Sequence, residues 1–443
     1  MRHGEIWQGL NGVLLFAFVA LLIVVHMAYA VVPLLALAVM VLGSGVLWLT
    51  GEDHGTSRAR RSLLRAGDDA WLVLVLLAYG GLWLLDVWRT GHWPVGEGNQ
   101  RVLLPLWPLL ATALLVWLLR YPPSPRLLWW AVCSGALGAG SIALYERLVL
   151  GRSRASNAMN AIPFGNLSLL LGTLSLLAAL WCLRRGYPRS RVLLGTALLA
   201  AVSGMLGSLL SGTRGGWIAV PFLLLLAYRA ARDLVPSRWR YGLAGLVVLV
   251  LLVAAAVPHT GVSHRIVQAV TNVQQYWQGE TRANSVGARL EMWRGGILLV
   301  RERPWLGWGE GRMEMAIHDL VLEGRLPAAV ERHDQLHSDV IDTMARRGVV
   351  GLTGLLMLYG VPLWLCWRRL RRPGADPGTQ VLAAAGMMVP VAFIDFGLTQ
   401  SMLRDVRGLS GYLGLCVACW VALRAHERRL SLPHERAAPE SSS

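Results

Sequence analysis

The chain has 443 residues, of which 55% are hydrophobic and 15% are charged, and its mean hydropathy is +0.48. Apolar runs of about 20 residues recur, which is the length that crosses a hydrocarbon core about 30 Å thick. This pattern excludes a set of soluble domains and predicts an all-α polytopic membrane protein. The formal charge of +16 comes from arginine, since the sequence contains no lysine. No basic helix or aromatic-basic platform accompanies that charge, so nucleic acid is not an expected partner.

About twelve apolar runs are the candidate spans, at 9–28, 31–49, 69–88, 103–120, 127–149, 163–183, 192–211, 215–229, 241–257, 348–367, 380–400 and 408–424. Arginines cluster in five of the even-numbered connections, namely those after the second, fourth, sixth, eighth and tenth runs. Cytoplasmic loops favour basic residues. We therefore expect these connections and both termini to face the cytoplasm, which in a bacterium would place the protein in the inner membrane. The first run is expected to remain as a helix, although it ends in a sequence that resembles a signal-peptidase site.

This organisation predicts an N-terminal membrane domain of about nine helices at 1–257, a loop at 258–347, C-terminal membrane helices at 348–430 and a disordered cytoplasmic tail at 431–443. The loop is the only long interval without a spanning run, and the topology places it in the periplasm. It carries nine arginines between Arg265 and Arg332, against the usual charge bias of such loops. We expect this largely helical loop to contain the catalytic elements.

Further arginines fall on the same predicted face, namely Arg147, Arg152 and Arg154 after the fifth run, Arg214 after the seventh, and Arg404 and Arg407 after the eleventh. Each one alone could pair with a carboxylate or a lipid headgroup. As a set facing one compartment they favour an anionic ligand. The planar guanidinium suits a phosphate or diphosphate better than an ammonium does.

Within the loop, residues 285–303 are predicted to form an amphipathic helix. Val286, Leu290, Trp293, Ile297 and Val300 recur at helical spacing and form its expected apolar face. A proline then ends the helix, and three glycines at alternate positions predict a loop. That glycine run follows no strand, so it does not indicate a dinucleotide site.

Two histidines, His333 and His337, lie one helical turn apart and superficially resemble a zinc motif, but an aspartate stands where the motif needs glutamate. Alternatively, a helix begins near Ser338, which is a good N-cap residue, and carries Asp339 and Asp342 in its first turns. His337 would then lie at a helix N-terminus, where the dipole disfavours the imidazolium. A neutral imidazole there is a candidate general base, although a histidine that merely packs at the interface would give the same pattern.

Other catalytic motifs are missing from the sequence, including a nucleophile elbow and a P-loop. Enzymes that use nucleotide sugars usually need carboxylates and a metal, whereas this loop is rich in arginine. We therefore expect metal-free chemistry and no cofactor. The five cysteines lie in or beside apolar runs, so a disulfide framework is not expected.

The combination resembles the O-antigen ligase and polymerase superfamily, and within it the lipopolysaccharide O-antigen ligases. The matching segments are SGTRGG around Arg214, ARLEMWRGGILLVRERPWLGWG around Arg289 and HSDVIDTMARRGVVG from His337, with NAIPFGNL from Asn160 as a further element. These motifs cover roughly half the chain, and the topology agrees over nearly all of it. One departure is Ser338, where the family usually has asparagine.

The resemblance implies transfer of a polysaccharide from undecaprenyl diphosphate to lipid A–core at the periplasmic face, without nucleotide or metal. It makes His337 the family's essential histidine and places Arg214 and Arg289 near the diphosphate. We add Arg265, which follows the ninth run where a headgroup would lie. Further diphosphate candidates are Arg152 and Arg154, and secondary site candidates are His333, Ser338, Arg147 and Asn160.

Four alternatives remain open at this stage. An O-antigen polymerase would use the same donor with a second lipid-linked glycan as acceptor, and a protein O-oligosaccharyltransferase would use a protein. A transporter or flippase for lipid-linked glycans would move the lipid without breaking a bond. A zinc protease would depend on a metal held by His333 and His337.

Overall fold

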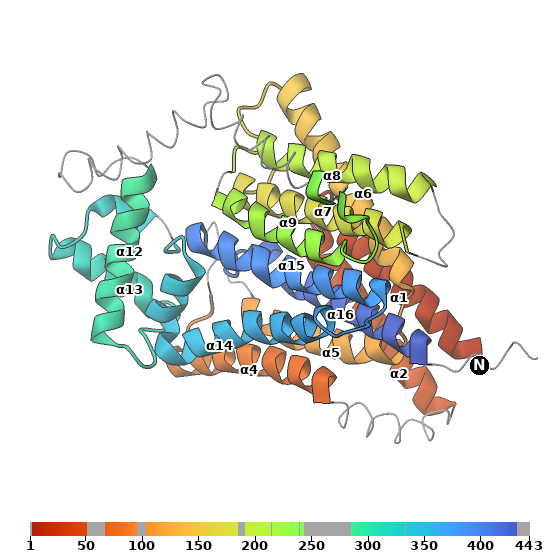
Figure 1. Cartoon of the computed structure of the whole chain (residues 1–443). Helices are drawn as coiled ribbons and strands as arrows, with labels where there is room; N and C mark the ends of the chain where they lie inside the picture. The colour runs from red at the N-terminus through yellow and green to blue at the C-terminus, as the bar shows by residue number, and fades with distance from the viewer. Residues whose placement is uncertain are drawn as a thin grey trace, which may run out of the picture.

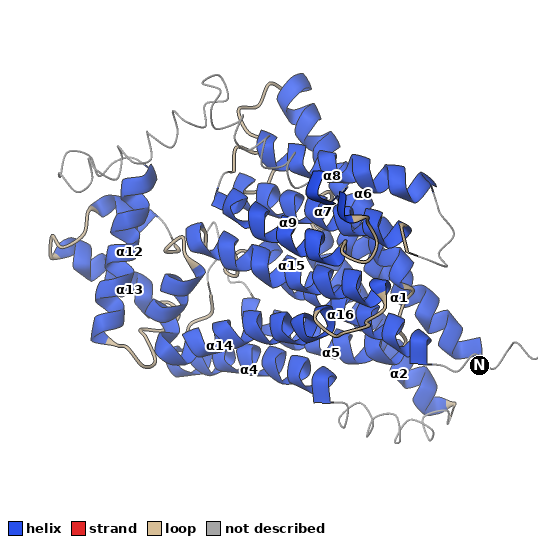
Figure 2. Cartoon of the chain, in the orientation of Figure 1, coloured by secondary structure: helices blue, strands red, loops and turns tan. Residues whose placement is uncertain are grey.

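The computed structural model describes residues 2–50, 67–94, 103–184, 191–213, 215–238, 240–242, 285–332 and 334–431. Over these residues the secondary structure consists of helices and their connecting turns, without a strand (Figure 2). The predicted all-α class is confirmed. The five cysteines are free and buried, as expected for small apolar side chains in a helical core.

Nine of the described helices are long and apolar enough to cross a membrane. They are α1 (Arg2–Leu21), α2 (Ala28–Leu49), α4 (Gly67–Thr90), α6 (Pro125–Leu144) with the π-helical turn η3 (Tyr145–Val149), α7 (Ala161–Cys182), α8 (Arg191–Leu210), α14 (Asp339–Leu370), α15 (Pro377–Thr399) and α16 (Val406–Ser431). Two shorter apolar helices, α5 (Trp107–Arg120) after η2 (Leu104–Leu106) and α9 (Ala219–Ala230) after η4 (Gly215–Ile218), also pack in the bundle. Together they cover eleven of the twelve predicted spans. The span predicted at 241–257 lies almost wholly outside the described residues.

Helices α7, α15 and α16 form the centre of the bundle, because 83% of the most apolar 18-residue stretch of each helix is buried inside the protein. Helix α15 packs against α7, α9, α14 and α16, and α7 also packs against α6 and α8. Helices that are apolar on every side are expected at such central positions. The end of α15 and the starts of α7 and α16 lie beside the site described below, so the packing of these helices positions its residues.

One group of ion pairs joins the start of α4 to the ends of α14 and α16, at the end of the bundle near the N-terminus (Figure 1). At the end near the N-terminus, Arg369 bridges Asp68 at 3.0 Å and Glu427 at 2.7 Å. Arg424 pairs there with Asp69 at 3.0 Å. The loop helices lie at the other end. The predicted common side of the basic connections and the compartment that each end faces stay predictions.

A small helical subdomain covers the end of the bundle away from the N-terminus (Figure 1). It consists of α12 (Ser285–Glu302), α13 (Arg312–Leu322) and η6 (Ala328–Arg332). Its own hydrophobic core is separate from that of the bundle and is made by side chains that include Met292, Leu299, Met313, Ile317 and Leu336. The loop at 258–347 therefore holds a folded unit over the part that the structure describes.

Helix α12 occupies the predicted interval, and Val300 of the predicted apolar face packs against the subdomain core, but the prediction for Ile297 was wrong. Ile297 is 47% exposed, whereas Met292 and Leu299 are buried. The reason is the glycine pair that precedes Ile297: a Cβ atom on Gly296 would lie 2.4 Å from Cγ2 of Ile341. Close backbone approach at the glycines brings α12 against α14 and turns Ile297 outward.

Helix α14 begins at Asp339, close to the start predicted near Ser338, and continues across the predicted domain boundary at 347/348. The boundary coincides with a break in the helix, because Gly348 has φ 60° and ψ −156°. Ala345, before Gly348, belongs to the hydrophobic core of the subdomain, whereas Leu355, after it, belongs to the core of the bundle.

Candidate functional site

His337 lies at the junction between the subdomain and the bundle, one residue before the N-cap of α14. Its Nδ1 atom is 2.6 Å from Oε1 of Gln400, the residue that follows α15. In the tautomer that carries its proton on Nδ1, the imidazole donates a hydrogen bond to this amide oxygen and has its lone pair on Nε2. The half-buried ring is thus oriented by a neutral neighbour from a distant segment.

The backbone at His337 is left-handed, with φ 51°, which is uncommon for a residue with a side chain. Hydrogen bonds on both sides hold this conformation. The amide of Leu336 donates to Oδ1 of Asp342 at 3.1 Å, and the amide of Ser338 donates to Oγ of Ser401 at 3.1 Å. Strain that is held in this way is frequent at functional sites.

Ser338 is the N-cap of α14, as predicted, but its hydroxyl makes no capping hydrogen bond. The aspartates of the first turn also do more than complement the helix dipole. Asp339 accepts a hydrogen bond from the Leu403 amide at 3.0 Å and one from the Tyr359 hydroxyl at 3.2 Å. The start of α14 is therefore fastened to the connection between α15 and α16.

Arg289 and Arg154 lie within electrostatic reach of one another, from α12 and from the segment between η3 and α7. Arg289 is half-buried, and burial lowers the pKa of its guanidinium, as does the positive charge of Arg154. Among the residues that the structure describes, Arg289 has no ion-pair partner. Nε of Arg154 donates to the Ser211 carbonyl at 2.7 Å. An anion at this position would offset both guanidinium charges.

The other candidates in η3 and in the segment between η3 and α7 have structural roles. Arg152 forms an ion pair with Glu146, which is buried. Arg147 donates to the Arg152 carbonyl at 2.5 Å. The Asn160 side chain caps α7 by accepting from the amide of Ile162 at 3.0 Å. These three residues shape the segment that presents Arg154.

Arg214, Arg265 and His333 lie outside the described residues, so their predicted roles stay predictions. The neighbours of Arg214 are described. The Thr213 hydroxyl donates to the Ala161 carbonyl at 2.8 Å. A Cβ atom on Gly215 would lie 2.3 Å from Oγ1 of Thr399, the residue before Gln400.

Sequence reasoning included Arg404 of the connection between α15 and α16 among the arginines of one face, but it missed Gln400 and Ser401. The available signal was the polar pair Gln400 and Ser401 directly after an apolar run. It also missed Glu310, which lies between two glycines and is completely buried.

Comparisons with known proteins agree with the resemblance in the sequence. Residues 198–356 match the family model described as O-Antigen ligase. The chain is also similar to an uncharacterized protein of Haemophilus influenzae strain Rd, with 23% identity over 349 residues. That similarity covers 79% of this chain and 85% of the relative. The family match includes Arg214, Arg289 and His337 and confirms the resemblance to the O-antigen ligase superfamily.

Proposed function

We propose, from the O-antigen ligase match over residues 198–356, that this chain is a metal-independent, inverting glycosyltransferase. It transfers O-antigen polysaccharide from undecaprenyl diphosphate to a hydroxyl group of lipid A–core. In this proposal the protein lies in the bacterial inner membrane, with its site facing the periplasm and both termini in the cytoplasm. The observation that carries the mechanism is the contact between His337 and Gln400 at 2.6 Å.

His337 is the proposed general base. A carboxylate partner would favour the imidazolium, whereas the neutral amide of Gln400 orients the ring without adding a negative charge. With the proton on Nδ1 directed at Gln400, Nε2 is the atom that accepts a proton from the acceptor hydroxyl. Proton transfer of this kind contributes roughly 10² to 10⁴ to a rate.

Arg289 and Arg154 are the proposed contacts for the diphosphate, together with Arg214 and Arg265 from the sequence. The half-buried guanidinium of Arg289 has an unfavourable like-charged neighbour and no carboxylate among the described residues. A diphosphate would supply the missing negative charge. One such donor group, aimed at the charge that develops in the transition state, is worth about 3 kcal/mol.

The reaction follows from these roles. The acceptor oxygen forms a bond to the anomeric carbon of the donor while the bond from that carbon to the diphosphate oxygen breaks, with inversion. The proton of the acceptor hydroxyl passes to His337. Undecaprenyl diphosphate leaves with its negative charge, which the arginines offset.

Purified protein reconstituted with lipid-linked glycan tests the acceptor. The proposal expects glycan on lipid A–core and no elongation when a second lipid-linked glycan is the only acceptor. Elongation without ligation would make the protein an O-antigen polymerase. Movement of the lipid across a vesicle membrane, with no bond cleaved, would indicate a flippase instead.

A further inference from the structure

The break in α14 is filled by the loop that follows α12. In an unbroken helix the amides of residues 349 and 350 would bind carbonyl groups four residues earlier. At Gly348 the backbone takes a conformation that is essentially restricted to glycine. The Val349 amide donates instead to the Pro304 carbonyl at 2.8 Å, and the Val350 amide to the Trp305 carbonyl at 3.2 Å.

The carbonyl groups released by the same break bind the loop in return. The Trp308 amide donates to the Ala345 carbonyl at 2.9 Å, and the Gly309 amide to the Arg346 carbonyl at 2.7 Å. The loop thus replaces both lost pairs of the helix, and it lies so close that a Cβ atom on Gly307 would be 2.4 Å from the Arg346 carbonyl carbon. These contacts place Glu310, the residue after Gly309, inside the protein.

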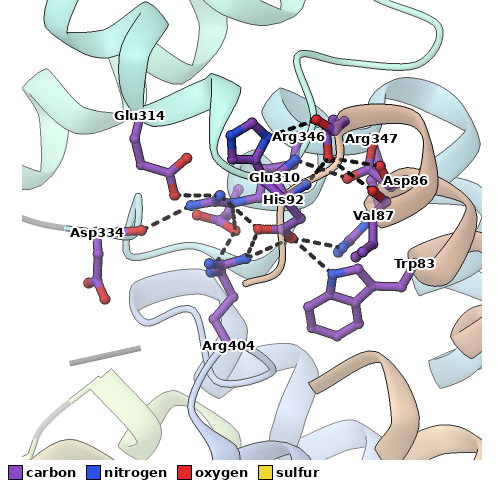
Figure 3. Close-up of polar contacts among 12 residues, drawn as sticks. Trp83, Asp86, Val87, His92, Glu310, Glu314, Asp334, Arg346, Arg347 and Arg404 are labelled. Carbon is purple, nitrogen blue, oxygen red and sulfur yellow. Dashed lines mark hydrogen bonds and ion pairs between the residues drawn. The ribbon is translucent and has the colours of Figure 1, made fainter. Parts of the chain in front are cut away.

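Glu310 is fully buried and is surrounded by arginines from α14 and from the connection between α15 and α16 (Figure 3). Its carboxylate contacts Arg346 at 3.1 Å, Arg347 at 3.4 Å and Arg404 at 2.9 Å. It also accepts a hydrogen bond from Nε1 of Trp83 at 2.9 Å. One carboxylate therefore joins the loop, α14, α4 and the connection after α15.

The charge of Glu310 is maintained by this environment. Burial alone would raise the pKa of the carboxyl group, but Arg404, Arg346 and Arg347 outweigh it and lower the pKa to about 2. The backbone amide of Glu310 is held as well, since it donates to Asp86 at 3.1 Å. Glu310 remains an anion at every pH at which the protein would work.

The same arginines reach the segments that hold His337. Arg346 donates to the Asp334 carbonyl at 2.9 Å and binds Asp342 at 3.0 Å, and Asp342 accepts the Leu336 amide. Arg404 lies in the connection that begins with Gln400, the partner of His337. The two halves of the His337 contact are thus linked through Glu310.

We propose that Glu310 is a positioning residue, whose carboxylate holds the segment before His337 and the connection after α15 in register. It touches neither substrate nor the reacting atoms, and its effect on transfer rests on the function proposed above for His337. Removing the charge releases both segments and loosens the contact between His337 and Gln400.

Glu310→Gln tests this role because it keeps the size of the side chain and removes the charge. Hydrogen exchange read by mass spectrometry should rise in peptides covering 334–338 and 400–405 and stay unchanged in those covering α7. The kcat for transfer should fall by roughly 100-fold, which is the loss expected when a reacting group is misplaced by about 1 Å. The KM for the donor should stay within about twofold of the wild-type value. Glu331→Gln is the matched control, because Glu331 forms an exposed pair with His318 in the same subdomain. It should change neither the hydrogen exchange of these peptides nor the kcat of transfer.

If Glu310→Gln does not fold, the double variant Glu310→Gln with Arg404→Gln removes one charge of each sign and serves instead. Unchanged exchange in both segments, or activity within about threefold of wild type, would overturn the proposal. The exchange readout is independent of the reaction. Increased exchange in a protein whose His337→Ala variant is fully active would therefore refute the proposed function and leave the link through Glu310 standing.

Discussion

Nδ1 of His337 lies 2.6 Å from Oε1 of Gln400, although 63 residues separate them in the sequence. The contact joins the start of α14 to the end of α15, and it gives the imidazole an orientation that neither helix could set alone. Its partner is an uncharged side chain, which suits a histidine that must accept a proton.

Gln400→Leu should lower kcat by roughly 10-fold to 100-fold, because the imidazole loses the hydrogen bond that fixes its orientation. Steady-state kinetics with the reconstituted enzyme would measure the loss. Gln380→Leu, at the opposite end of the same helix, is the control and should remain within about twofold of wild type. Equal activities of the two variants would show that the Gln400 amide has no role in orienting His337.

Arg289→Lys keeps the positive charge and loses the planar fork, so kcat/KM for the lipid-linked donor should fall by at least about tenfold. The equivalent change at Arg294, which is exposed on the same helix and pairs with Glu291, is the control. Should both variants turn over donor like wild type, the proposed diphosphate contact of Arg289 would be wrong.

The stability that Glu310 contributes should depend on pH in a defined way. Its folded pKa of about 2 is below the ordinary value of 4.5, so the contribution is complete above the ordinary value and is lost as the pH falls towards 2. Loss of one partner of a buried pair costs about 3 kcal/mol. Thermal unfolding should show the same difference between wild type and Glu310→Gln at pH 6 and pH 8, with a smaller difference near pH 3. A difference that already shrinks between pH 8 and pH 6 would contradict this account.

The sequence predicted the fold well because the length and composition of a membrane span are local properties. Eleven of the predicted spans coincide with described helices, and the start of α14 lies next to its predicted N-cap Ser338. The prediction for Ile297 on α12 was wrong because a count of apolar residues ignores the close approach that Gly296 allows to α14.

The partners within the site were harder to predict. Glu310 meets Arg346 and Arg404 across 36 and 94 residues, and no spacing rule connects positions so far apart. Gln400 carries no charge and belongs to no motif, so only the fold brings it to His337. The arginines were recognisable as a set, but the structure was needed to separate Arg152, which is paired with Glu146, from Arg289, which has no ion-pair partner among the described residues.

The most direct test of the central claim is release of undecaprenyl diphosphate by wild type and by His337→Ala, each purified and given lipid-linked glycan and lipid A–core. Both proteins should be folded, as judged by unfolding temperature, and both should bind the donor. We predict that wild type releases undecaprenyl diphosphate with matching glycan on lipid A–core, and that the variant is slower by roughly 10² to 10⁴. Release by the variant at a rate close to that of wild type would contradict the assignment of His337 as the general base.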